Sequence, residues 1–148
     1  MLAELKLPMC IQTGPVGLPQ VRMLAEKFPG VNIMLDHLAR PDVLDGPPYA
    51  NAAGLFALRD LSNVYMKLTP RIFGDVKKEK ASAETFFSRV VEAFGAQRLA
   101  WGSNFPTSPG TLGEILATAQ QRLACLSEED RAWILGKTAQ KLYPALSK

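Results

Sequence analysis

The sequence alternates short, almost wholly apolar runs with longer segments in which apolar residues recur at three- and four-residue spacing. The apolar runs cover Leu7–Gln12, Val31–Leu35, Val64–Leu68 and Leu99–Trp101. Each has the length of a β-strand, and nearly continuous apolarity is typical of strands that are covered on both faces. The pattern therefore predicts four buried strands.

Amphipathic helices are expected between these strands. Bulky apolar residues share one face over Pro19–Phe28, Tyr49–Leu61 and Ala83–Phe94. Residues 1–6 resemble the tail of a helix, and residues 71–81 resemble an exposed loop.

Two further helices are expected after the fourth strand. Thr111-x-x-Glu114 and Ser127-x-x-Asp130 have the spacing of a capping box, which marks a helix N-terminus. We expect the first helix to run to about Leu126. Gly136 is expected to interrupt the second, and Pro144 to end it.

This alternation of strands and helices predicts an α/β fold with a parallel sheet. Right-handed crossovers place the carboxyl ends of all the strands on one rim. The polar residues that follow the strands would share this rim, namely Gln12, Asp36, His37, Arg40, Lys67, Thr69, Ser103 and Asn104. Four βα units could form half of a (β/α)8 barrel, which typically has about 250 residues, or a small doubly wound sheet.

Composition favours one globular domain over residues 1–148, with 47% apolar and 21% charged residues. We expect a cytoplasmic protein without a membrane segment, because the chain has neither a long apolar run nor a signal-peptide pattern. The net charge of +3 is scattered. Its one basic cluster, residues 77–80, contains an acidic residue, so we expect no nucleic-acid partner. Cys10 and Cys125 are expected to be buried free thiols.

Three strand-end motifs and the chain's final segment together resemble a known family. They are Val31-Asn-Ile-Met-Leu-Asp-His-Leu-Ala-Arg-Pro41, Asn63-Val-Tyr-Met-Lys-Leu-Thr69, Arg98-Leu-Ala-Trp-Gly-Ser-Asn-Phe-Pro106 and Ile134-Leu-Gly-Lys-Thr-Ala-Gln-Lys-Leu-Tyr143. In this order they resemble the C-terminal half of the amidohydrolase-related family, TIM-barrel proteins that include lactone and pyrone dicarboxylate hydrolases. The resemblance implies four βα units equivalent to barrel strands five to eight, followed by a terminal helix pair.

The sequence departs from this family in two ways. The family's first strand carries a His-x-His pair, whereas this chain has a single histidine. We therefore expect no metal site and no cofactor in residues 1–148 alone, and a divalent metal only in a complete barrel. In addition, Asn104 stands where many relatives carry an aspartate. An amide cannot act as a base, but it can orient a water molecule or a carbonyl group.

The resemblance implies that His37 and Asn104 are the catalytic residues. His37 would contact substrate, transfer a proton or bind metal. The alternative is a structural histidine bonded to Asp36 or to a backbone carbonyl. Gln12 could bind substrate or be a hydrogen-bonded amide on the rim.

Three cationic residues are further substrate-binding candidates. Arg40 could hold a substrate carboxylate or pair with Asp36 or Asp42 as a loop clamp. Lys67 could point inward, as a charge that requires an anion, or outward between helices, which we favour. Arg71 is a weaker candidate on the rim.

The resemblance implies a hydrolase that acts on a small carboxylated lactone, ester or amide. His37 would polarise the carbonyl, Asn104 would position water, and Arg40 would bind the carboxylate. We expect a homodimer or an N-terminal half-barrel as partner, and little activity from this chain alone. A non-catalytic lobe that is stable only by association, and a small doubly wound binding domain, are the alternatives.

Overall fold

The computed structural model describes residues 2–147 and contains a four-stranded parallel sheet. The strands lie in chain order, each paired with the next. They are β1 (Met9–Ile11), β2 (Ile33–Leu35), β3 (Val64–Leu68) and β4 (Leu99–Trp101). The four predicted strands and their parallel arrangement are confirmed.

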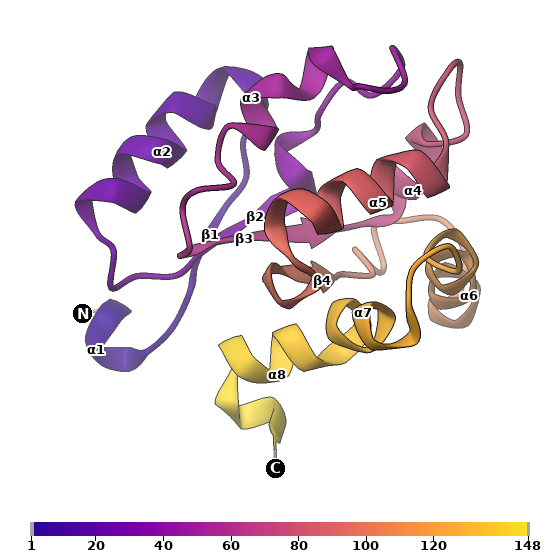
Figure 1. Cartoon of the computed structure of the whole chain (residues 1–148). Helices are drawn as coiled ribbons and strands as arrows, with labels where there is room; N and C mark the ends of the chain where they lie inside the picture. The colour runs from indigo at the N-terminus through magenta and orange to yellow at the C-terminus, as the bar shows by residue number, and fades with distance from the viewer. Residues whose placement is uncertain (1, 148) are drawn as a thin grey trace.

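Helices connect the strands and cover the sheet (Figure 1). They are α1 (Leu2–Leu5), α2 (Leu18–Lys27), α3 (Ala53–Phe56), α4 (Pro70–Asp75), α5 (Ala83–Phe94), α6 (Leu112–Arg122), α7 (Glu128–Ala132) and α8 (Thr138–Leu142). Figure 1 shows α2, α3 and α5 on one side of the sheet and α7 and α8 on the other. Within residues 2–147, no helix is long and apolar enough to span a membrane.

The main core lies between the sheet and the helices on the α2 and α5 side. Val64, Met66 and Leu68 of β3 face it and are fully buried. Phe86 and Phe87 of α5 pack into the same core. Because side chains alternate along a strand, Tyr65 and Lys67 must lie on the opposite face of the sheet.

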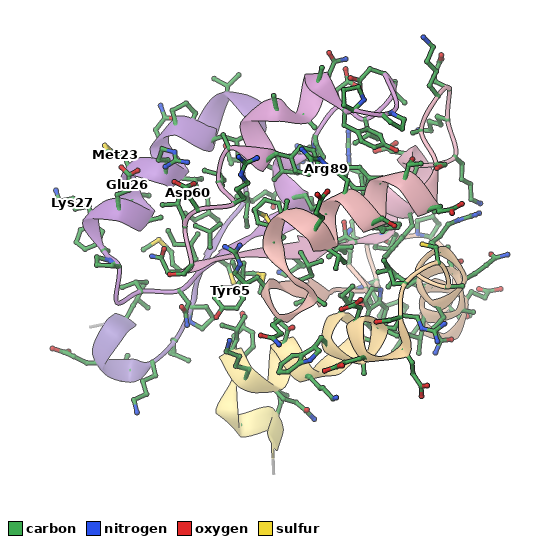
Figure 2. All side chains as sticks on the ribbon, in the orientation of Figure 1. Met23, Glu26, Lys27, Asp60, Tyr65 and Arg89 are labelled. Carbon is green, nitrogen blue, oxygen red and sulfur yellow. The ribbon has the colours of Figure 1, made fainter. Side chains whose placement is uncertain are left out.

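The C-terminal helix covers part of that opposite face. Leu142 of α8 packs against Met34, Tyr65 and Ala100 in a second apolar cluster. The ammonium of Lys141 lies over the ring of Tyr65, 5.6 Å from its centroid, and Figure 2 shows Tyr65 between the sheet and α8. Tyr65 is near the start of β3, so this cover leaves the carboxyl end of the sheet open.

The two helices predicted after β4 are confirmed, but their boundaries differ from those predicted. Thr111 and Glu114 form the reciprocal capping box of α6, and the hydroxyl of Ser127 accepts from the backbone N–H of Asp130 at the start of α7. Helix α6 ends at Arg122, before the expected end at about Leu126. Gly136 lies in a π-helical segment, Trp133–Lys137, that joins α7 to α8.

The sequence suggested an exposed loop over residues 71–81, but only part of this segment is a loop in the structure. Its first part belongs to α4, where Pro70 occupies the first turn. Proline favours this position because it lacks only an N–H that would be unpaired there. Ile72, Phe73 and Val76 are buried, so this short helix contributes to the core.

The helix predicted over Tyr49–Leu61 is much shorter in the structure. A 3₁₀ turn over residues 50–52 leads into the single turn of α3, and the backbone leaves the helix after Phe56. The guanidinium of Arg98 donates to the carbonyls of Arg59 and Leu61, over 2.8 and 2.7 Å. These bonds satisfy carbonyls in the segment after the helix, which explains how the chain can end it early.

Both cysteines are free, but neither is buried. Cys10 and Cys125 are exposed, which contradicts the expectation of buried thiols. Cys10 lies on β1, an edge strand of the sheet among the described residues, and Cys125 follows the end of α6. The apolar residues that flank each cysteine in the sequence therefore do not bury its thiol.

Candidate functional site

A hollow of about 440 Å³ lies at the carboxyl ends of the strands. Segments that follow all four strands contribute to it, which is where α/β proteins place their ligands. Its lining residues are Gln12, His37, Arg40, Arg71, Asn104 and Thr107. The structure thus brings together every site residue expected from the sequence except Lys67.

The turn that carries His37 and Arg40 has an unusual backbone. Four consecutive residues, His37 to Arg40, have φ angles between 52° and 56°. Non-glycine residues rarely adopt this left-handed conformation, which costs about 1–2 kcal/mol per residue. Leu38 and Ala39 are 0% and 1% exposed. Burial of these two side chains in the main core offsets the strain and fixes the direction in which His37 and Arg40 leave β2.

His37 is held through its ring. Nδ1 of His37 lies 2.8 Å from Oγ1 of Thr69, the residue that follows β3. Burial lowers the pKa of His37, and the positive charges of Arg40, Lys67 and Arg71 lower it further, while Asp36 acts in the opposite direction. The imidazole is therefore neutral at pH 7. The ring contacts the hydroxyl of Thr69, and not Asp36 or a backbone carbonyl, the partners expected for a structural histidine.

Asn104 also has a left-handed backbone, with a φ of 51°. Asparagine tolerates this conformation better than most residues do. Its side-chain nitrogen donates to Oγ of Ser108 over 3.2 Å, and its backbone carbonyl accepts from the N–H of Ser108. These two bonds orient the amide and leave its Oδ1 available to accept a hydrogen bond in the hollow.

Arg40 and Arg71 give the hollow a positive charge that no lining carboxylate balances. The loop clamp considered for Arg40 does not form. Asp36 pairs with Lys67, and Asp42 accepts from the N–H of Leu44 and from the side chain of Asn51. Nε of Arg71 is 3.7 Å from Asp75, a long ion pair for an exposed side chain. Among the described residues, Arg40 has no carboxylate partner and Arg71 has only this long pair, so both guanidiniums can bind a further carboxylate.

Lys67 points inward, so the favoured outward orientation is wrong. Its ammonium lies 2.5 Å from Oδ1 of Asp36, and both side chains are partly buried. A β-carbon placed on Gly102 would lie 3.0 Å from Cδ of Lys67, so the glycine leaves room for this side chain. Lys67 pairs with Asp36 and is not among the residues that line the hollow.

Two threonines belong to the site in ways the sequence did not reveal. Thr69 was placed on the rim, but its contact with His37 joins residues that are 32 positions apart. Thr107 lines the hollow three residues after Asn104 and was not singled out. The sequence feature that could have identified Thr107 is its position in the loop that follows the fourth strand.

The described residues do not fit a divalent metal ion. Within residues 2–147, no three His, Cys, Asp or Glu side chains lie close enough to hold one. The single histidine binds Thr69 through one ring nitrogen, and its nearest carboxylate, Asp36, is paired with Lys67. Two arginines line the space in which a cation would lie.

The chain is thus an α/β protein with a polar hollow at the strand ends, the rim at which proteins of this class generally bind small molecules. Sequence comparison identifies the family. The amidohydrolase profile Amidohydro_2 matches residues 1–145, and the chain belongs to this family. The resemblance noted in the strand-end motifs is confirmed.

Individual relatives agree with this assignment. L-fucono-1,5-lactonase from Burkholderia ambifaria is 30% identical over 138 residues, which cover 87% of this chain and 47% of that protein. An amidohydrolase from Burkholderia multivorans, solved with bound zinc, superposes with a TM-score of 0.75 at 23% identity, covering 97% of this chain and 54% of that one. A Pseudomonas putida protein provisionally assigned as a 2-pyrone-4,6-dicarboxylic acid hydrolase gives 0.74 at 21% identity, with the same coverage.

The solved structures share the fold of this chain. The chain spans about half the length of the lactonase and of both solved proteins. The α/β architecture with four parallel strands therefore matches part of these larger amidohydrolase folds.

Proposed function

We propose that this chain supplies the carboxylate-binding side of a hydrolase that acts on small carboxylated lactones. The observation that carries the proposal is the pair Arg40 and Arg71, which line a hollow at the strand ends without a lining carboxylate. Membership of the amidohydrolase family and the similarity to a lactonase support hydrolysis of a ring ester.

Each lining residue takes a role that its chemistry allows. Arg40 and Arg71 bind the substrate carboxylate, because guanidinium and carboxylate groups form paired hydrogen bonds. His37, which is neutral at pH 7, contacts the lactone carbonyl. Asn104 accepts a hydrogen bond from the attacking water through Oδ1 and so orients it, while Gln12 contacts the substrate from the far side of the rim.

Activation of the water requires a base, and in this proposal no lining residue serves as one, because His37 is engaged with the lactone carbonyl. None of the six lining side chains is a carboxylate, and an amide at position 104 cannot accept a proton. We propose that the four strands correspond to strands five to eight of a (β/α)8 barrel, and that a complementary half-barrel provides the base. That half is a second copy of this chain or an N-terminal half-barrel, and a divalent metal belongs to the completed barrel in this proposal.

Calorimetric titration tests the substrate class. The purified chain is titrated with a carboxylated lactone and, as matched ligand, with its neutral methyl ester. We expect saturable binding of the carboxylate form and at least tenfold weaker binding of the ester, since a hydrogen-bonded ion pair contributes about 1.5–3 kcal/mol. Equal affinity for both ligands, or no binding of either, would contradict the proposal.

Turnover and molecular mass test the need for a second half. We expect little or no lactone hydrolysis by the purified chain, and a dimer or a complex with a half-barrel by light scattering. Rapid turnover by a monomer would show that no complementary half is required.

A further inference from the structure

Thr69 makes an unusual use of its hydroxyl. It occupies the N-cap position of α4, where a threonine side chain ordinarily accepts from a backbone N–H of the first turn. Here the side chain makes no capping bond. Its Oγ1 instead lies 2.8 Å from Nδ1 of His37. The hydroxyl is thus directed from its own helix to the histidine of the candidate site.

The direction of this hydrogen bond follows from burial. Thr69 is 1% exposed, so solvent does not reach its hydroxyl. Among the described residues, Nδ1 of His37 is the only side-chain partner of Oγ1. A buried hydroxyl that donates to no acceptor is destabilising, so its proton is directed at Nδ1. Nδ1 then accepts, and in the neutral ring the proton must be on Nε2.

We propose that Thr69 is a positioning residue that holds His37 in its Nε2–H tautomer, so that the ring presents an N–H donor to a substrate oxygen in the hollow. The donor role rests on the proposed function, whereas the tautomer does not. In this form Nε2 already carries a proton, so His37 cannot take one from water. The histidine therefore acts as a hydrogen-bond donor to the carbonyl and to the negative charge that develops on it.

Both partners in this bond are held firmly. The carbonyl of Thr69 accepts from the N–H of Ile72 in the first turn of α4, and Ile72 is buried. His37 is fixed by the left-handed turn that Leu38 and Ala39 anchor in the core. The lowered pKa of His37 keeps the ring neutral, which is the state in which a tautomer is defined.

Nuclear magnetic resonance tests the tautomer directly, because His37 is the only histidine in the chain. The untagged chain is labelled with ¹⁵N-histidine and studied at about pH 8, above the ordinary histidine pKa of about 6.5. Two-bond ¹H–¹⁵N correlations then show which ring nitrogen carries the proton. We expect a single neutral form with Nε2 protonated. A ring protonated on Nδ1 would overturn the proposal.

Two variants test the role of Thr69 itself. Thr69→Ser keeps a hydroxyl, and we expect it to retain the wild-type spectrum. Thr69→Val keeps the shape without the donor, and we expect the ratio of the Nε2–H to the Nδ1–H form to fall about fivefold, the factor given by one ordinary hydrogen bond. An unchanged ratio in Thr69→Val would show that Thr69 does not set the tautomer.

The wild-type spectrum decides the tautomer even if Thr69→Val does not fold, because a ring protonated on Nδ1 would still overturn the proposal. This spectrum also requires no ligand. A failure to bind carboxylated lactones with the tautomer intact would overturn the proposed function alone, and the wrong tautomer with binding intact would overturn this inference alone.

Discussion

Two of the hollows that contain arginines, one at the strand ends and one among the outer helices, differ in how those charges are balanced. The strand-end hollow contains Arg40 and Arg71. The outer hollow, of about 590 Å³, lies among α2, α3 and α5 and contains Arg22, Arg59 and Arg89. The outer hollow is larger and has more arginines, yet its surroundings are nearly neutral.

Carboxylates account for the difference. Arg22 pairs with Asp60 over 2.7 Å and with Glu26 over 2.9 Å, and Arg89 pairs with Glu92 over 3.0 Å. Figure 2 shows Asp60 close to the part of α2 that carries Glu26, and Arg89 on α5. Hydrogen bonds from Arg22 lower the pKa of the Asp60 carboxyl. Arg22 joins α2 to the segment after α3, and Arg89 pairs with a carboxylate of its own helix, whereas Arg40 and Arg71 face a space that an anion can fill. Unbalanced charge, rather than size, is therefore the feature that favours the strand-end hollow as the proposed ligand site.

The largest effect is expected from removing both site arginines. Arg40→Ala combined with Arg71→Ala should weaken binding of a carboxylate probe such as citrate by at least about a hundredfold, because each charge-assisted bond contributes about 1.5–3 kcal/mol. The matched control is Arg59→Ala with Arg89→Ala in the outer hollow, which should leave the affinity unchanged. Calorimetry measures both. Equal losses in the two double variants would remove the distinction between the hollows.

The strained turn beneath the site should be sensitive to its buried anchor. Leu38→Ala should lower the free energy of unfolding by about 3 kcal/mol, within the range for buried leucines, because it removes the burial that offsets the left-handed backbone. Val16→Ala is the control, since Val16 is 90% exposed and should change stability by less than about 0.5 kcal/mol. Urea unfolding measures both. A loss below about 1 kcal/mol in Leu38→Ala would contradict the anchoring role.

Adding a carboxylate to the strand-end hollow should make it resemble the outer one. Thr107→Glu places a negative charge on the lining, and Thr107→Gln is the neutral control. We expect the glutamate to weaken citrate binding roughly five- to tenfold through repulsion, and the glutamine to have little effect. Salt should reduce the difference between the two variants. If both variants bind citrate equally well, charge balance does not control the site.

The smallest expected effect is the contribution of His37 to the pH dependence of the free energy of unfolding. The pKa of His37 is lowered in the folded protein, so the unfolded chain binds a proton more readily. The stability that this shift contributes is present above the unfolded pKa of about 6.5 and is lost as the pH falls through the lower folded value. The wild type should therefore lose more stability than His37→Gln between about pH 7.5 and pH 5. Parallel pH dependences of the two proteins would contradict the lowered pKa.

The sequence predicted the sheet because its signals are local. Continuous apolar runs identify buried strands, and parallel order follows from the helices between them. The shared rim then follows from topology, which is why Gln12, His37, Arg40, Arg71 and Asn104 could be grouped before their contacts were known.

The features that the sequence did not predict depend on contacts between residues that are distant in the sequence. Nothing local in His37-Leu-Ala-Arg40 favours a left-handed backbone, and only the core that surrounds Leu38 holds it there. The bond from Thr69 to His37 depends on the register that places Leu35 beside Met66. The inward direction of Lys67 was readable from its alternation with Met66 and Leu68, but its partner Asp36 comes from another strand end. The helix predicted over Tyr49–Leu61 ends early, and the backbone carbonyls beyond its end accept hydrogen bonds from Arg98, which is distant in the sequence.

A crystal structure of the chain with a carboxylated lactone bound tests the central claim most directly. The account predicts the ligand in the strand-end hollow, with its carboxylate within hydrogen-bonding distance of Arg40 and Arg71 and its ring carbonyl toward Nε2 of His37. A ligand bound instead among Arg22, Arg59 and Arg89, or one that directs its carbonyl to the arginines and its carboxylate away from them, would contradict it.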